Sequence, residues 1–139
     1  MQDNTLQGIE RPQGLKLVKE AITSDQETEL LVAMEGLPFS YYAGGPGNPR
    51  SSVSFGWKHD FTNDTFVLCA PIPDEFRQVC EVAADCAGIH PSEIVECLVN
   101  CYETGAIIRP HLDKPVWNHI VGLSLGSDVI EVRLPPRSI

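Results

Sequence analysis

Residues 94–102 constrain this chain more than any other stretch, because their side chains alternate strictly between two faces. The valines and cysteines occupy one face, and Leu98, Asn100 and Tyr102 occupy the other. Such alternation is typical of a β-strand with one side against a core. The amide of Asn100 and the phenol of Tyr102 can donate hydrogen bonds to a bound carboxylate. The alternative is structural, with Tyr102 packing and Asn100 capping the end of the strand.

His111 and Asp113 form the second feature, since two residues that are two positions apart in an extended segment point the same way. One imidazole nitrogen and one carboxylate oxygen can then hold a divalent metal ion from one side. They supply two thirds of a facial triad of two histidines and one carboxylate. A His-x-Asp pair also arises by chance, and it would then be a solvated strand end.

Four ordered blocks resemble the core of the AlkB-type nucleic-acid demethylases, which are iron(II)- and 2-oxoglutarate-dependent dioxygenases, and in particular their bacterial branch. The blocks are Ser54-Phe55-Gly56-Trp57 with Asp60-Phe61, Asn100-x-Tyr102 with Gly105, His111-x-Asp113-Lys114-Pro115, and Ile120-x-x-Leu123-Ser124-Leu125-Gly126. The resemblance implies that His111 and Asp113 bind iron(II) and that Asn100 and Tyr102 contact 2-oxoglutarate. The implied reaction is oxidative dealkylation of N-alkylated bases in DNA or RNA.

The family pattern continues with a second metal-binding histidine and two arginines, one of which pairs with 2-oxoglutarate. Residues 134–139 resemble the segment that precedes them, and only His119 supplies an imidazole after Asp113. The resemblance therefore implies a C-terminally incomplete site. With two protein ligands, we expect weak retention of iron and weak binding of 2-oxoglutarate.

Phe55 and Trp57 are candidates for contact with the substrate. Residues 50–57 alternate as a strand, and an aromatic ring that stacks on a base contributes about 1 to 3 kcal/mol. Aromatic residues spaced by two on a strand are more often part of the core. The glycine-rich residues 44–49 suit a mobile surface loop, and the resemblance implies a lid over the nucleotide.

The remaining patterns predict an α+β fold, which the resemblance specifies as a double-stranded β-helix (jelly roll) with flanking helices, lacking its last strands. We expect a loose arm over residues 1–13 and one domain over 14–139. Helices are predicted from Ser24, with a capping box to Glu27 and a left-handed stop at Gly36, and over 74–87. Strands are predicted at 15–21, 50–57, 94–102, 106–111, 119–125 and 129–134.

The net charge of −9 over 139 residues argues against a broad basic face for nucleic acid. It keeps two alternatives open: a non-catalytic jelly-roll binding module, and a protein or small-molecule hydroxylase. The sequence has no apolar run of about 20 residues and no signal peptide, which predicts a cytoplasmic protein without a membrane partner. Five cysteines without framework spacing favour reduced thiols over zinc ligation.

Overall fold

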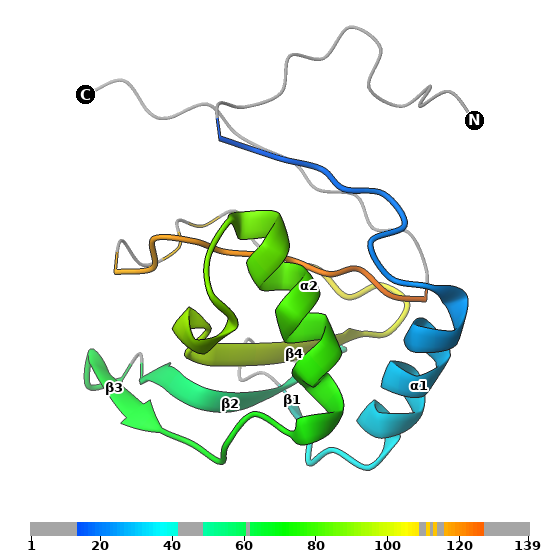
Figure 1. Cartoon of the computed structure of the whole chain (residues 1–139). Coiled ribbons are helices and arrows are strands. Elements are labelled where there is room, and N and C mark those ends of the chain that lie inside the picture. Colours follow the sequence, from blue (N-terminus) through cyan, green and yellow to red (C-terminus); the bar gives the residue numbers. More distant parts are fainter. Residues whose placement is uncertain are drawn as a thin grey trace, which may run out of the picture.

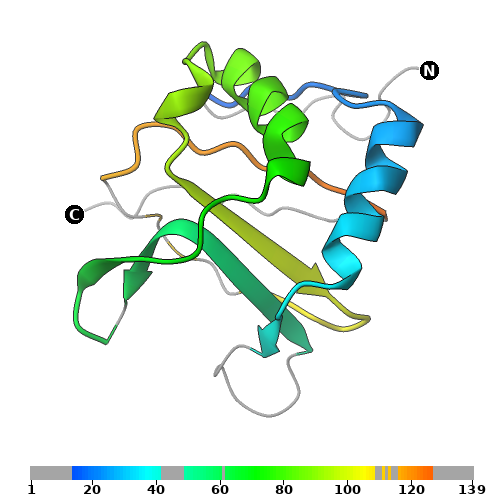
Figure 2. The ribbon, with the colours of Figure 1, turned by 60° about the horizontal axis from the view of Figure 1, so that its bottom comes forward.

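The computed structural model describes residues 14–41, 49–60, 62–108, 111, 113 and 116–126. It contains an antiparallel sheet whose one face is covered by two helices (Figures 1 and 2). In chain order the elements are α1 (Ser24–Glu35), β1 (Ser40–Tyr41), β2 (Arg50–Asp60), β3 (Thr65–Leu68), the 3-10 turn η1 (Asp74–Phe76), α2 (Arg77–Ala87), the 3-10 turn η2 (Pro91–Glu93) and β4 (Glu96–Tyr102). This mixture of helices and antiparallel strands agrees with the predicted α+β class. The jelly roll stays a prediction.

Strand β2 is the centre of the sheet, because it pairs with each of the other three strands. Its first part, from Arg50 to Gly56, runs antiparallel to β4, and its last part, from Trp57 to Asp60, runs antiparallel to β3. The change of partner falls at Gly56, whose φ is 75°. A Cβ atom at this position would collide with the carbonyl oxygen of Val95. Only glycine can adopt this positive φ and also leave room for the Val95 carbonyl oxygen without strain.

The core lies between the helices and the sheet. Its buried residues are Leu30 of α1, Phe55 of β2, Phe76 of η1 and Val99 of β4. The rings of Phe55 and Phe76 meet edge to face, with centroids 6.0 Å apart and planes at 81°, an arrangement that aromatic pairs favour. Two helices and the sheet thus share one small apolar centre.

The capping box of α1 begins one residue earlier than the sequence analysis predicted. Thr23 is the N-cap: its hydroxyl accepts the Gln26 amide at 3.1 Å, and the Gln26 side chain accepts the Thr23 amide at 2.8 Å. Thr23 with Gln26 and Ser24 with Glu27 both fit the capping-box pattern, so the sequence alone could not decide which residue is the N-cap. The predicted left-handed stop at Gly36 is also wrong, since its φ is −89°. Gly88, after α2, does adopt the left-handed conformation.

Five of the six predicted strands fall wholly or partly within the described residues, and two of the five form strands. Residues 50–57 and 96–102 form β2 and β4, as expected, while residues 15–21 form turns and coil with Leu17 51% exposed. The predicted strands at 106–111 and 119–125 are coil wherever the structure describes them. Alternation predicts which side chains share a face, but a strand also needs a neighbouring strand to bond with. Residues 1–13 and the predicted strand at 129–134 lie outside the described residues.

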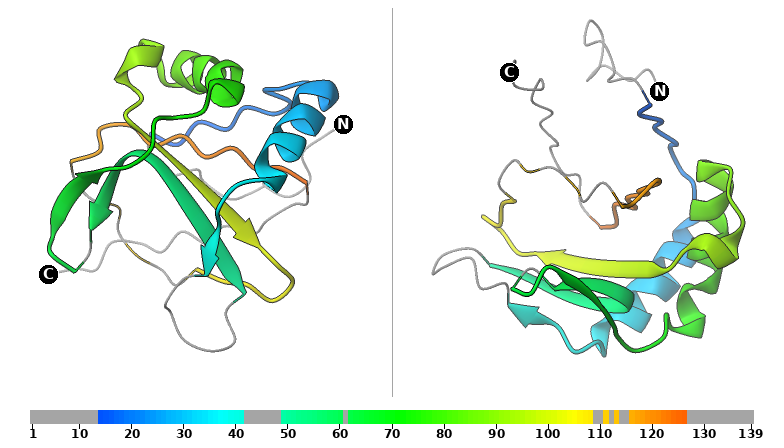
Figure 3. Two further views of the ribbon diagram at one scale, coloured as in Figure 1. Left: turned by 90° about the horizontal axis from the view of Figure 1, so that it is seen from below. Right: turned by 90° about the vertical axis from the view of Figure 1, so that its left-hand side faces the viewer.

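Residues 116–126 run from β3 to the start of α1, and Figure 3 shows this segment in orange. Near its beginning, the ring of Trp117 meets the ring of Phe66 of β3 edge to face, with centroids 5.5 Å apart. At its end, the Gly126 amide donates to Oε1 of Glu27 at 2.8 Å, and Leu125 packs against the core. We call the described residues between 103 and 126 the returning segment. No described helix is long and apolar enough to cross a membrane.

Candidate functional site

The two predicted metal ligands lie close together on the returning segment. Nε2 of His111 is 3.3 Å from Oδ1 of Asp113, and each side chain is 57% exposed. Two donor atoms at right angles on a metal ion, with bonds of about 2.1 Å, are separated by about 3 Å. The observed separation therefore fits adjacent positions on one ion. Both groups are also open to solvent, so an ion could reach them without any change in the core.

Within the part of the chain that the structure describes, no group of three or more histidine, cysteine, aspartate or glutamate side chains could hold a metal ion. His119 lies exposed in the returning segment. Nε2 of His59 lies 2.8 Å from Oδ1 of Asp64, and His90 caps η2. The donor set that fits iron(II) is thus one imidazole and one carboxylate, two of the three ligands of a facial triad.

Asn100 and Tyr102 lie on the face of β4 that points away from the helices. The register places Val99 opposite Val53 and Cys97 opposite Phe55, both on the core side. Directly opposite residues of an antiparallel pair share a face, and neighbours along a strand alternate. Asn100 is half-buried and Tyr102 is 42% exposed. Their amide and phenol can therefore reach a ligand on that side of the sheet.

The two aromatic substrate candidates differ in accessibility. Phe55 is only 6% exposed and packs on Phe76 in the core, so in this arrangement its ring is closed to a base. Trp57 is 43% exposed and pairs with Leu68 of β3. Phe55 therefore has the core position that was the alternative to a role in base stacking. The ring of Trp57 remains partly exposed to solvent.

An aromatic contact chain that sequence reasoning missed connects the β2–β3 hairpin to the returning segment. His59 is 7% exposed and meets Phe66 edge to face at 5.2 Å, and Phe66 in turn meets Trp117. Trp117 lies four residues after Asp113, so this contact fixes the chain just beyond the metal candidates. No local pattern predicts it, because residues 66 and 117 are distant in sequence.

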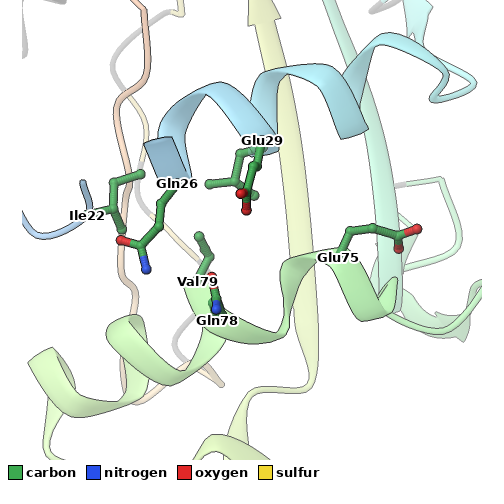
Figure 4. A pocket seen from close by; sticks show the side chains of 7 residues that line it. Ile22, Gln26, Glu29, Glu75, Gln78 and Val79 are labelled. Carbon is green, nitrogen blue, oxygen red and sulfur yellow. The ribbon is translucent and has the colours of Figure 1, made fainter. Parts of the chain in front are cut away.

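Two hollows lie next to the helices, and neither is lined by a predicted site residue. The first, between α1 and α2, is drawn in Figure 4, where Gln26 and Glu29 of α1 lie opposite Gln78 and Val79 of α2. Its volume is about 20 Å³, room for about one water molecule. The second, about 360 Å³, is a shallow hollow over the start of α2 and η2.

Burial raises the pKa of two groups on β4. It raises the pKa of the Glu96 carboxyl above its usual range, and the charges of His59 and Lys58 oppose that rise. Burial, with smaller effects from Cys80 and Glu96, raises the pKa of the Cys97 thiol to about 11. Cys97 is therefore protonated at neutral pH. The five cysteines are all free thiols.

The chain is similar to a curated protein. It is the Mus musculus tRNA (carboxymethyluridine(34)-5-O)-methyltransferase ALKBH8, to which the chain is 27% identical over 149 residues, covering 92% of this chain and 22% of that protein. The similarity supports an AlkB-like relationship. The chain spans about a fifth of the relative's length. No protein-family model matches the sequence, and no solved structure matches it.

Proposed function

We propose that this chain is an iron(II)- and 2-oxoglutarate-dependent dioxygenase domain of AlkB type, which removes alkyl groups from bases of DNA or RNA by oxidation. The observation that carries the proposal is the pair His111 and Asp113, whose donor atoms are 3.3 Å apart and open to solvent. The similarity to ALKBH8 covers 92% of the chain and supports it.

In this proposal each residue has a separate task. Nε2 of His111 and Oδ1 of Asp113 hold the iron(II), which when bound supplies the activation of oxygen. The amide of Asn100 and the phenol of Tyr102 donate hydrogen bonds that orient 2-oxoglutarate. The exposed ring of Trp57 is the candidate for stacking on a base. The chain's contribution is positioning of the reactants.

Iron binding tests the metal ligands. We expect anaerobic titration with iron(II) and 2-oxoglutarate, followed by the visible charge-transfer band, to give weak binding in the 139-residue chain. His111→Ala and Asp113→Asn should weaken it further, by about tenfold or more, since each removes one of two ligands. His90→Ala is the matched control, because His90 is exposed and caps η2. Equal binding by all three variants would contradict the assignment of the ligands.

Turnover tests the reaction. With a methylated oligonucleotide, the proposal predicts release of succinate and formaldehyde in equal amounts. The charge of −9 specifically favours a second candidate, a protein or small-molecule hydroxylase. Release of succinate without any nucleic acid would support that candidate. The third candidate is a non-catalytic binding module. It is favoured because the described residues bring together only two candidate metal ligands, His111 and Asp113. This candidate predicts that a partner binds and that no succinate is released.

A further inference from the structure

Trp117 attaches the returning segment to the sheet close to the candidate metal ligands. Within residues 116–126, Trp117 and Leu125 are half-buried and all the others are exposed. The ring of Trp117 meets the ring of Phe66 of β3 edge to face, with centroids 5.5 Å apart and planes at 90°. Trp117 follows Asp113 by four residues, and four residues of chain span at most about 14 Å. The ring contact therefore limits how far Asp113 can move away from β3.

Phe66 is itself supported by a buried imidazole. It lies directly opposite His59 in the pairing of β2 with β3. The two rings meet edge to face with centroids 5.2 Å apart, and His59 is 7% exposed. Nε2 of His59 lies 2.8 Å from Oδ1 of Asp64. The ring of Phe66 thus has a fixed neighbour on the hairpin as well as Trp117 on the returning segment.

The turn between β2 and β3 is closed by side-chain hydrogen bonds. The carboxylate of Asp60 accepts the side-chain amide of Asn63 at 2.8 Å and the backbone amide of Thr62 at 2.9 Å, and these bonds lower the pKa of Asp60. Asp64 has a φ of 51°, a left-handed conformation that aspartate adopts more readily than most residues. The turn therefore fixes the register that places Phe66 opposite His59.

The candidate metal ligands lack comparable support from burial. The side chains of His111 and Asp113 are each 57% exposed, although their donor atoms are only 3.3 Å apart. A metal ion binds well only to those molecules in which both donors point to the same place. When that fraction of the molecules falls, the apparent affinity falls in proportion. Any contact that restricts the chain near Asp113 can therefore raise the affinity for the metal ion.

We propose that Phe66 and Trp117 are positioning residues for the metal pair of His111 and Asp113. Their ring contact holds the returning segment against the β2–β3 hairpin, and this increases the fraction of molecules in which both donors can reach one ion. The inference rests on the proposed function for the identity of the metal ligands. It adds that the hairpin, through β3, sets the affinity of a site to which it contributes no ligand.

Titration of the 139-residue chain with cobalt(II), followed by visible absorption, measures the affinity of the metal pair without turnover. F66A should lower this affinity by about 2- to 10-fold, the factor expected for the loss of one aromatic contact. W117A should lower it by the same factor, because it removes the same contact. W117F keeps an aromatic ring at this position and should recover most of the wild-type affinity.

Two control variants separate positioning from a general loss of stability. V67A shortens the neighbouring side chain of β3, which faces the other way and is 41% exposed, close to the 39% of Phe66. L125A loosens the far end of the returning segment, twelve residues after Asp113. Both variants should bind cobalt(II) as the wild type does. A loss of affinity in V67A as large as in F66A would overturn the inference.

Coupling between two sites is reciprocal, so a bound metal ion should also favour the ring contact. W57F leaves Trp117 as the one tryptophan of the chain, and its emission then reports on that contact. Saturating cobalt(II) should move the emission maximum of W57F to shorter wavelength and should not move that of the double variant W57F/F66A. An emission maximum that stays unchanged in W57F would contradict the coupling.

H111A distinguishes failure of this inference from failure of the proposed function. Unchanged affinity for cobalt(II) in H111A would show that the ion binds elsewhere, and both proposals would then be wrong. Loss of binding in H111A, together with wild-type affinity in F66A and W117A, would leave the proposed function standing. In that case the positioning role of Phe66 and Trp117 alone would be wrong.

Discussion

The scaffold up to Tyr102 and the returning segment after it are held in different ways. Along β4, every residue from Glu96 to Tyr102 is paired with a residue of β2, and Val99 enters the buried core. Among the described residues, the returning segment is attached by the hydrogen bonds of Glu103 with Pro49 and Tyr41, the ring contact of Trp117, the bond from Gly126 to Glu27 and the packing of Leu125. Its Ile107 and Ile120 are 64% and 60% exposed.

The region that stabilises the fold is therefore not the region that carries the candidate metal ligands. The scaffold holds the backbone ladder and the aromatic core, whereas the side chains of His111 and Asp113 are each 57% exposed. Regions with few buried apolar contacts open at low free energy. We therefore expect changes in the scaffold to affect unfolding strongly, and changes in the returning segment to affect the local arrangement around the metal ligands.

The largest effect is expected from Phe76→Ala, because Phe76 is 2% exposed and packs on Phe55. Removal of a buried phenyl ring costs about 3 to 5 kcal/mol, measured as the loss in free energy of unfolding in urea. Phe66→Ala is the matched control, since Phe66 is 39% exposed and contacts the returning segment. Equal losses for the two variants would remove the distinction between the regions.

The next effect is expected from Gly56→Ala in β2. The alanine would take a positive φ and place its Cβ against the Val95 carbonyl oxygen, at a combined cost of about 3 kcal/mol. Gly36→Ala is the comparison, because φ is −89° there and the space around it is open. A Gly56→Ala protein with the wild-type denaturation midpoint would show that the change of partner along β2 tolerates a side chain.

A smaller effect is expected from Glu27→Gln. The substitution weakens the bond that the Gly126 amide donates to Oε1 of Glu27, at a cost of about 1 kcal/mol. Hydrogen exchange should accelerate at residues 119–126 and stay unchanged in β2 and β4. Asp25→Asn removes an acid from the same first turn of α1 and should leave those amides unchanged. Faster exchange throughout the sheet would mean that the two regions open together.

The smallest effect is expected from Glu96→Gln, and it depends on pH. Burial raises the pKa of Glu96 above 4.5, so the protonated carboxyl is favoured in the folded state. The stabilisation of the folded state by the neutral carboxyl is fully present below the pKa of Glu96 in the unfolded chain. It is lost as the pH rises through the higher pKa of the folded state. Glu96→Gln should therefore stabilise the protein at pH 7 by roughly 0.5 kcal/mol after solvent screening. The gain should vanish below about pH 4, and a gain that is constant with pH would contradict this cause.

Local patterns predicted the elements that depend on local rules. The alternation of residues 50–57 and 94–102 and the helical spacing before Gly88 correspond to β2, β4 and α2. The patterns could not predict partners. Residues 119–125 alternate like a strand yet have no ladder in the structure, and the contact between Phe66 and Trp117 joins distant residues.

In the candidate site, too, the features that depend on local spacing could be predicted and those that depend on tertiary contacts could not. The approach of His111 to Asp113 followed from a spacing of two, and it is observed as a 3.3 Å separation. The position of Arg50 opposite Tyr102 could not be predicted, because the register of β2 on β4 depends on tertiary packing. The core position of Phe55 agrees with the structural alternative drawn from the strand pattern, whereas its ring partner, Phe76 of η1, could not be predicted locally.

The pairing of β2 with all three other strands has a consequence for synthesis of the chain. Residues 50–60 leave the ribosome well before residues 96–102, which provide the longest of their three ladders. A sheet that joins distant segments forms slowly, since the intervening chain must be closed into a loop first. Until Tyr102 emerges, the edge of β2 that pairs with β4 lacks that ladder, and a nascent chain stalled before that point would present an unpaired strand edge.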